Sequence, residues 1–246
     1  MPPEPRRTLP VMPGHPVNGW RQPPYWRLRF DRLLHGRCHF CNGPVADGGL
    51  CPGCREDLPW ITAACRCCGA TLSSGAATCA GCIGDPPPFQ RTHALWQYRD
   101  GIDDCLRAFK DRGDIAMGRL LTDLAVAALT RRGLRLPGPL VPMPLHRDRY
   151  RQRGFNQSVL IGRWLGGPCL EDLVERSRNT ADQRGLDARQ RRANLDRAFR
   201  LRRPPPRAVT LVDDVMTTGA SLRALAHCLR EGGAEHIRVL VLARAV

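Results

Sequence analysis

Lysine is nearly absent from this sequence. Lys110 is the only one, so almost all of the 38 basic side chains are arginines. Against 23 acidic side chains they give a formal net charge of +15, which favours polyanionic partners such as nucleic acid, pyrophosphate-bearing molecules or an anionic membrane surface. A bias toward arginine codons would produce the same surface with no partner at all, so charge alone leaves both interpretations open.

Long apolar runs are lacking as well. No stretch approaches the roughly 18 to 20 residues that a membrane-spanning helix needs. The first thirty residues, rich in proline and arginine, lack the apolar core of a secretory signal. The sequence therefore predicts a cytoplasmic protein with no transmembrane segment, either free or peripheral to the inner face of the membrane. Its 246 residues suffice for one α/β domain of ordinary size and a smaller appendage.

Cysteine is abundant and clustered, with nine of the twelve residues between positions 38 and 82. Four Cys-x-x-Cys pairs form a repeat in which each pair returns after 27 or 28 residues. The pairs are Cys38 and Cys41, Cys51 and Cys54, Cys65 and Cys68, and Cys79 and Cys82. Each such loop places two thiolates at adjacent corners of a tetrahedron, and four thiolates close a structural zinc site. We therefore expect about two structural zinc ions, whose binding supplies folding energy to a segment with few apolar residues.

Two alternatives for this segment are a disulfide framework and redox-active Cys-x-x-Cys pairs. Regular spacing without a secretion signal disfavours both. The spacings fit a sequential pairing of ligands and an interleaved pairing equally, and the shorter loops favour the sequential one. Cys67 is surplus to the pattern. Because a four-thiolate site has no open coordination position, the module is predicted to be structural or partner-binding rather than catalytic.

The stretch 209–221 runs from apolar residues into two carboxylates, Asp213 and Asp214, and then through hydroxyl residues and a glycine into a helical pattern. This order predicts a buried strand, a tight turn and a helix N-terminus. The N–H groups and hydroxyls suit a phosphate, and the carboxylates suit the hydroxyls of a sugar or a divalent cation. The alternative is a capped strand–turn–helix with two solvated aspartates.

The same stretch resembles the phosphoribosyl-pyrophosphate (PRPP) loop of type I phosphoribosyltransferases. That resemblance implies that the acidic pair contacts ribose hydroxyls and that the turn wraps a 5′-phosphate. The candidate PRPP-binding residues are Asp213, Asp214, Val215, Met216, Thr217, Thr218, Gly219, Ala220 and Ser221.

A second segment, 141–147, follows another predicted strand and should therefore reach the same crevice. Guanidiniums after it, at Arg149, Arg151 and Arg153, suit a second anionic group such as pyrophosphate. The alternative is a solvated arginine-rich loop. The candidate pyrophosphate loop consists of Pro144, Leu145, His146 and Arg147.

A third segment, 177–197, is too polar for a core and too rich in arginine for a neutral linker. A flap that closes over phosphates and an electrostatic groove for a nucleic-acid backbone would both need this composition, and an ordinary exposed loop is an equal alternative. Its candidate residues are Arg178, Gln183, Arg189 and Arg192. Aromatic residues make up only 6% of the chain, so phosphate contacts are a better way to hold DNA here than base stacking.

Between these motifs, predicted strands and helices alternate from residue 92 onward. Strands are expected near 93–98, 141–144, 170–176, 209–212 and 236–243, and helices near 101–110, 114–132, 155–166 and 219–231. Alternation of this kind predicts an α/β fold with a mostly parallel sheet and flanking helices, and a site at the carboxyl ends of the strands. We expect a Pro/Arg-rich tail and lead-in over 1–34, a double zinc ribbon over 35–85 and a phosphoribosyltransferase-like domain over 92–246.

As a set, these motifs resemble the ComF family of double-zinc-ribbon, type I phosphoribosyltransferase-like proteins over about residues 30–246. The shared elements include the Cys-x-x-Cys repeat, Phe109-Lys110, the Pro-x-Pro-x-His element, Arg153 to Gln157, the Asp-Asp turn and Ala243-Arg244. The resemblance implies binding of PRPP or a ribose phosphate with Mg²⁺. It also implies a role in natural competence, in the uptake or processing of single-stranded DNA with partners from the competence machinery. Phosphoribosyl transfer to an unidentified acceptor is the alternative function, because the fold alone does not establish the reaction.

Overall fold

The computed structural model describes residues 36–45, 49–73, 75–177 and 198–245. The predicted tail over 1–34 lies outside these residues. In chain order the elements are α2 (Pro52–Glu56), α3 (Ala80–Gly84), β1 (Arg91–Gln97), α4 (Ile102–Arg112), α5 (Ile115–Arg131), β2 (Leu140–Pro142), α6 (Arg147–Arg153), α7 (Gln157–Trp164), β3 (Val174–Arg176), β4 (Phe199–Leu201), β5 (Ala208–Met216), α9 (Ala220–Glu231) and β6 (His236–Arg244).

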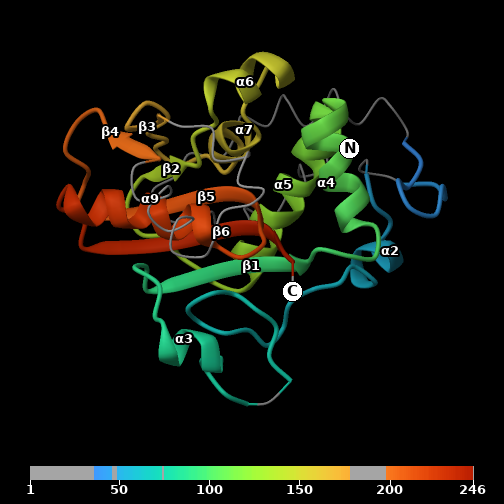
Figure 1. The fold of residues 1–246 in the computed structure, drawn as a ribbon. Helices are drawn as coiled ribbons and strands as arrows, with labels where there is room; N and C mark the ends of the chain where they lie inside the picture. The colour runs from blue at the N-terminus through green and yellow to red at the C-terminus, as the bar shows by residue number, and fades with distance from the viewer. Residues whose placement is uncertain (1–35, 46–48, 74, 178–197, 246) are drawn as a thin grey trace, which may run out of the picture.

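Four strands form a parallel sheet in the order β1-β6-β5-β2 (Figure 1). The two central strands, β5 and β6, are nearly continuous apolar runs, as expected for strands covered on both faces. In register, Leu211 of β5 lies between Val239 of β6 and Val141 of β2. The predicted mostly parallel sheet with flanking helices is therefore confirmed.

Alternate residues of the central strands serve two cores on opposite faces of the sheet. Val212 and Leu240 pack with α4, α5 and α7. Leu211 and Val239 pack with α9 and with the β3–β4 hairpin. Because both faces are covered, the edge at the carboxyl ends of the strands is where this fold exposes polar groups.

One predicted strand differs from the structure, and one helix was not predicted. The strand expected near 170–176 is shorter, and β3 pairs antiparallel with β4 in a separate two-stranded sheet instead of joining the parallel one. Its Val174 and the Phe199 of β4 bury against the α9 core, so the hairpin acts as a cover for that face. Segment 147–153, for which no helix or strand was predicted, forms the helix α6, which His146 caps at its start and Gly154 at its end.

The cysteine-rich segment packs directly on the α/β part. In its first half, Leu50 and Cys38 belong to the core shared with α4 and α5. Between the halves the chain runs along the edge of β1, where the Ile61 N–H donates to the Leu95 carbonyl at 2.8 Å. There the rings of Trp60 and Trp96 lie 5.1 Å apart. Among the helices that the structure describes, none has the length and apolar character that a bilayer crossing requires.

Candidate functional site

Two groups of four thiols stand where the repeat predicted metal sites. Within each group the sulfur atoms all lie within 4.8 Å of one another. The Sγ atoms of Cys41 and Cys51 are 3.6 Å apart and those of Cys68 and Cys79 are 3.7 Å apart. A tetrahedral zinc ion with Zn–S bonds of about 2.3 Å needs sulfur atoms roughly 3.8 Å apart. The donor sets therefore fit two structural zinc ions.

The grouping is sequential. The first set consists of Cys38, Cys41, Cys51 and Cys54, and the second of Cys65, Cys68, Cys79 and Cys82. Cys67, the surplus residue, belongs to neither set, and its backbone carbonyl accepts a hydrogen bond from the Thr92 hydroxyl. The prediction of two four-cysteine sites is confirmed, and the sequential arrangement is the one that the structure shows.

Backbone N–H groups converge on the first thiol of each set. Burial alone would raise the pKa of the Cys38 thiol, but N–H donors, foremost those of Cys41 and Cys51, outweigh it and lower the pKa to about 6. At Cys65, burial likewise raises the pKa of the thiol, but hydrogen bonds from the N–H groups of Cys68 and Cys79 outweigh it. The pKa of Cys65 is also lowered to about 6. The first thiol of each set is thus favoured as a thiolate, the form that ligates zinc, whereas hydrogen bonds between neighbouring thiols raise the pKa of Cys54 in the first set.

The Asp-Asp turn lies at the carboxyl end of β5, in the middle of the sheet. The chain leaves the sheet at Met216, turns through Gly219 with φ +76°, and enters α9 at Ala220. A Cβ atom at Gly219 would come within 2.4 Å of the terminal methyl of Met216, which a small shift of that flexible side chain can relieve, so the positive φ is the stronger reason for glycine here. The Ala220 N–H donates to the Thr218 hydroxyl.

The two carboxylates have different surroundings. Asp213 Oδ1 accepts from the Ser158 hydroxyl at 2.8 Å and from the Asp214 N–H at 3.0 Å. Burial, followed by the adjacent Asp214 carboxylate, raises the pKa of the Asp213 carboxyl well above its ordinary value. Asp214 is 5% exposed, and its Oδ2 has no hydrogen-bond partner among the described residues. A buried acceptor without a donor is costly, and the hydroxyl of a ligand would satisfy it.

The predicted pyrophosphate segment lies beside this turn because β2 and β5 are parallel neighbours. The Met143 N–H donates to the Val212 carbonyl at 2.9 Å, which carries the sheet pairing one residue beyond β2. Asn156 fixes the next element from both ends of its amide. Its Nδ2 donates to the Met143 carbonyl at 3.0 Å, and its Oδ1 accepts from the first N–H groups of α7.

A cavity of about 370 Å³ opens between these segments. From the Asp-Asp turn it is lined by Asp214, Val215, Thr217 and Ser221, and from the second segment by Leu145 and His146. Its other lining residues are Tyr98, Lys110, Arg149, Arg153, Gln157 and Arg176.

The lining of this smaller cavity carries an excess of positive charge. Four cationic side chains face one carboxylate, that of Asp214. The Arg153 guanidinium is held by Gln157 at 3.1 Å and by Asp111 at 2.9 Å, and its side chain is 15% exposed. Lys110 lies over the ring of Tyr98, with its Nζ 5.8 Å from the centroid. Fixed cations opposite a buried acceptor suit a ligand with an anionic end and a hydroxyl-bearing end.

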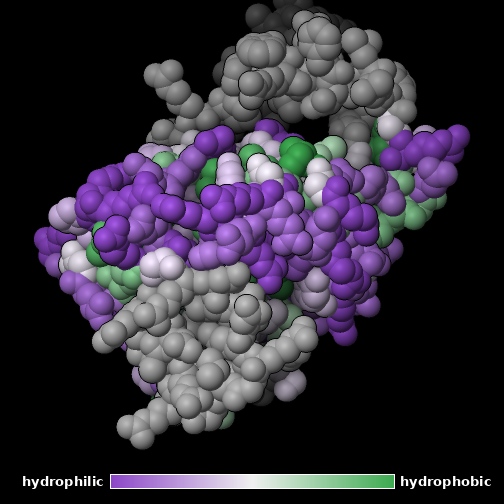
Figure 2. Space-filling model, turned by 45° about the horizontal axis from the view of Figure 1, so that its top comes forward, coloured by the Kyte–Doolittle hydropathy of each residue, from purple (hydrophilic) through white to green (hydrophobic). Residues whose placement is uncertain are grey.

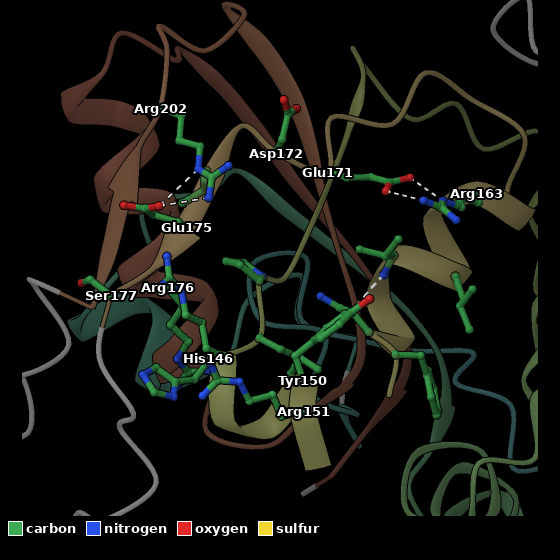
Figure 3. Close-up of a pocket in the computed structure, with 18 residues that line it drawn as sticks. His146, Tyr150, Arg151, Arg163, Glu171, Asp172, Glu175, Arg176, Ser177 and Arg202 are labelled. Atoms are coloured by element: carbon green, nitrogen blue, oxygen red, sulfur yellow. Dashed lines mark hydrogen bonds and ion pairs between the residues drawn. The ribbon is translucent and has the colours of Figure 1, made fainter. Parts of the chain in front are cut away.

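A larger cavity of about 750 Å³ adjoins the first and shares Leu145, His146 and Arg176 with it. In Figure 3, the Glu175–Arg202 and Glu171–Arg163 pairs lie on opposite sides of this cavity, with Tyr150 between them. His146 and Arg176 lie together in the same view. The acidic groups of the larger cavity are thus partnered, whereas the smaller cavity has the cationic excess.

Not all of the predicted residues meet at this site. Pro144 and Arg147 line only the larger cavity, and Asp213 turns toward Ser158 instead of lining either one. Met216 is buried in the core that contains α9, beneath the surface of the turn, and does not line either cavity. The remaining turn residues, Thr218, Gly219 and Ala220, form the entry to α9 and line neither of these two cavities. The predicted flap residues Arg178, Gln183, Arg189 and Arg192 lie outside the described residues.

Three residues at the site were not singled out from the sequence: Ser158, Arg176 and Tyr98. Each reaches it from a different element, and Ser158 contacts a residue 55 positions away in the chain. No local motif signals such a contact. Lys110 had appeared only through the family resemblance.

The comparisons with known proteins agree with the paired cysteine sites. A family model described as the double zinc ribbon domain matches residues 30–83. The chain is 35% identical to Competence protein F of Haemophilus influenzae over 223 residues, which are 85% of this chain and 97% of that relative. It is 35% identical to the DNA utilization protein YhgH of Escherichia coli K12 over 222 residues, covering 86% and 98%. Competence protein ComFC of Bacillus subtilis is 28% identical over 76% of this chain and 80% of its own length.

Fold and site together define a class: a parallel α/β protein with a polar crevice at the carboxyl edge of its sheet and a double zinc ribbon docked against it. The similarity to its relatives extends through both parts. The chain belongs to the ComF family of competence proteins.

Proposed function

We propose that this protein binds PRPP or a related ribose phosphate in the smaller cavity and uses that site in the handling of incoming single-stranded DNA. The observation that carries the proposal is the convergence, in about 370 Å³, of a buried unsatisfied carboxylate oxygen, the aliphatic hydroxyls of Thr217 and Ser221, and four cationic side chains. In this assignment Asp214 accepts from a ribose hydroxyl, and Asp213 holds the backbone of Asp214 in place by accepting from its N–H. Thr217, Ser221 and the first N–H groups of α9 bind the 5′-phosphate.

The pyrophosphate of PRPP would lie toward the second segment. His146 faces both cavities, and Arg149 and Arg153 supply positive charge beside it. Mg²⁺, when bound with PRPP, offsets the charge of the pyrophosphate. Pro144, Leu145 and Arg147 shape that end of the site. We keep the remaining turn residues and the flap residues of segment 178–197 in the proposal as parts of the same binding site.

The DNA part of the proposal rests on the relatives and on charge. Names of the relatives refer to competence and to DNA utilization. The net charge of +15 favours a phosphate backbone as partner. On the face drawn in Figure 2, hydrophilic residues dominate the described surface and apolar ones form small separate patches. A surface of this kind favours electrostatic contact with a polyanion over an extended apolar interface. Protein partners from the competence machinery would likewise bind it through polar and charged contacts.

Phosphoribosyl transfer is the second candidate function, and one observation favours it. The larger cavity opens from the smaller one at His146 and Arg176, so an acceptor could approach bound PRPP from that side. In both functions the α/β part, residues 92–246, is a type I phosphoribosyltransferase-like domain, and the ribbons occupy 35–85. The protein acts in the cytoplasm, where its positive charge also suits the anionic lipids of the membrane surface.

Binding and turnover separate the two functions. We expect single-stranded DNA to bind with an affinity that falls steeply as salt rises from 50 to 200 mM, the range over which several phosphate contacts lose roughly 10³-fold or more. An absent or salt-insensitive interaction would remove the DNA part of the proposal. Pyrophosphate release from PRPP, measured with and without candidate acceptors, tests the enzyme: sustained release with one acceptor would replace binding by transfer as the main function.

A further inference from the structure

One arginine connects the second four-cysteine site to the turn of the smaller cavity. Arg244, the last residue of β6, donates from Nε to the Cys68 carbonyl at 3.0 Å. Its Nη1 donates to the Met216 carbonyl at 3.1 Å and also to the Thr217 carbonyl. We propose that Arg244 is a positioning residue through which the second zinc site sets the geometry of the phosphate-binding turn. The proposal rests on the proposed function for the identity of the ligand.

Peptide geometry gives this contact its consequence. In a trans peptide unit the C=O and the following N–H point in opposite directions, and the described residues contain no cis peptide bond. Carbonyls of Met216 and Thr217 that are bound to Arg244 therefore direct the N–H groups of Thr217 and Thr218 away from Arg244. Thr217 lines the smaller cavity, so Arg244, together with the Ala245 N–H that also bonds the Met216 carbonyl, holds the Thr217 N–H ready for an anion and lowers the cost of reorganisation when the ligand binds.

The 65–68 loop, whose Cys68 carbonyl accepts from Arg244, is itself held against the sheet by hydrogen bonds and packing. The Thr92 hydroxyl donates to the Cys67 carbonyl and the Thr92 N–H donates to the Arg66 carbonyl. Gly69, with φ +69°, lies so close to Thr92 that a Cβ atom there would come within 2.9 Å of its methyl group. These contacts bracket Cys68 from both sides and hold its carbonyl in place.

The first zinc site has a different setting. The loops that carry its cysteines pack on α4 and α5. There Gly49 lies against Leu120, and the Phe40 ring lies against Gly101. Among residues 36–45, 49–73, 75–177 and 198–245, no hydrogen bond links that site to the turn residues 216–219. The two ribbons, although they are repeats, therefore differ in role: the second one acts on the site and the first one on the helical core.

Coupling of this kind is reciprocal. If the second ribbon holds the turn in its binding geometry, a ligand in the turn must in return stabilise the second ribbon. A contact that served only the overall stability of the fold would not transmit a ligand effect to one ribbon and spare the other.

Hydrogen–deuterium exchange with ribose 5-phosphate and with PRPP tests this on the full zinc-loaded chain. In the unsubstituted protein we expect the ligand to slow exchange in a peptide covering 66–72 and to leave one covering 38–45 unchanged. Arg244→Ala should weaken ligand binding roughly tenfold, within the range that linked sites show, and should abolish the protection of 66–72. Arg244→Lys should fall between them, because one ammonium cannot span both partners as a guanidinium does.

Arg230→Ala is the matched control. Arg230 also donates to a backbone carbonyl beyond the second ribbon, that of Pro88 at 2.6 Å, but it lies near the far end of α9. That variant should keep affinity and coupling. Zinc content and melting temperature, measured for every variant, identify any that fail to fold, and Arg244→Lys then carries the test.

The outcomes separate this inference from the proposed function. Unchanged affinity in Arg244→Ala and Arg244→Lys, or equal ligand protection of both ribbons, would overturn the role of Arg244 while leaving the ligand site intact. If the unsubstituted protein binds neither ligand, the proposed function fails. The role of Arg244 is then tested on the ligand-free protein. Arg244→Ala, with its zinc content unchanged, must speed hydrogen exchange at 216–219, and Arg230→Ala must not; equal exchange in both variants would overturn it.

Discussion

At the scale of single residues, the site contains buried carboxylates that lower the stability of the ligand-free protein. Asp213 and Asp214 stand side by side at the end of a buried strand, and one carboxylate oxygen is buried without a donor among the described residues. Folds keep such arrangements at functional positions, where stability is given up for binding. The pair is therefore the best point at which to separate binding from stability.

Replacing Asp213 by asparagine should stabilise the ligand-free protein. An asparagine Oδ1 can still accept from Ser158 and from the Asp214 N–H, and the charge repulsion disappears. We expect the melting temperature at pH 7.5 to rise by about 2–4 °C, which corresponds to roughly 1 kcal/mol in a chain of this size. Calorimetric melting measures it. Asp123→Asn, an exposed carboxylate paired with Arg119, is the control and should change little.

The same substitution has a pH signature. Because the folded-state pKa of Asp213 is raised above the unfolded value, the folded protein holds this proton to higher pH than the unfolded chain does. Its contribution to stability is present below the unfolded pKa and is lost as the pH rises through the raised folded pKa. The stabilising effect of Asp213→Asn should therefore grow with pH across that window. An effect independent of pH would contradict the raised pKa.

Gly219 offers a second test at this scale. Gly219→Ala imposes both a left-handed backbone strain and a clash with Met216, whereas Gly113→Ala, with φ +72° and open space around it, imposes the strain alone. We expect each substitution to cost about 1 kcal/mol, because the Met216 methyl can shift aside, with weaker ribose-phosphate binding only in Gly219→Ala. Chemical denaturation and calorimetry measure the two effects. Unchanged binding by Gly219→Ala would show that the turn does not depend on this glycine.

At the scale of elements, α7 is the part that ties the two predicted motifs together. Its N-cap, Asn156, bonds both the helix start and the Met143 carbonyl, and Ser158 in its first turn reaches Asp213. Asn156→Ala should cost about 1 kcal/mol of stability and also weaken ligand binding. Asp114→Ala removes the N-cap of α5 and should cost a similar amount with binding unchanged. Equal binding by both variants would mean that α7 does not position the site.

Elements with a strong apolar pattern were predictable from the sequence, and those without one were not. The strand–turn–helix over 209–221 appears as β5 and α9, because a buried strand and an amphipathic helix leave clear periodicities. Helix α6 was missed because Arg147–Arg153 has no apolar face. The place of β3 outside the parallel sheet depends on pairing with β4 across a segment of more than twenty residues, which no local pattern encodes.

The candidate site divides in the same way. Its Asp-Asp turn and the segment around His146 were found as motifs, since each lies on one continuous stretch of chain. Ser158, Arg176 and Tyr98 join the site only through the packing of distant elements. The four-cysteine sites were the most predictable feature, because metal geometry fixes the ligand spacing in sequence.

At the scale of the whole molecule, the cysteine-rich segment packs into both cores of the α/β part. Cys38 and Leu50 pack with α4 and α5, and Ile61 packs with the opposite face. Removal of zinc should therefore destabilise more than the ribbons. We expect close to two zinc ions per chain by elemental analysis, and a melting temperature that falls by 10 °C or more, on the order of several kcal/mol, after chelation. Full stability without metal would contradict the structural role of these sites.

Affinity for PRPP, measured by titration calorimetry in the presence of Mg²⁺, tests the central claim most directly. The unsubstituted protein should bind one PRPP per chain. Asp214→Asn should lose at least tenfold in affinity with its zinc content unchanged, because the charged acceptor is lost and an NH2 group, which cannot accept, replaces one of its two oxygens. Asp123→Asn should bind as the unsubstituted protein does. No heat of binding in the zinc-loaded protein, or equal affinity in Asp214→Asn, would contradict the assignment of this crevice to a ribose phosphate.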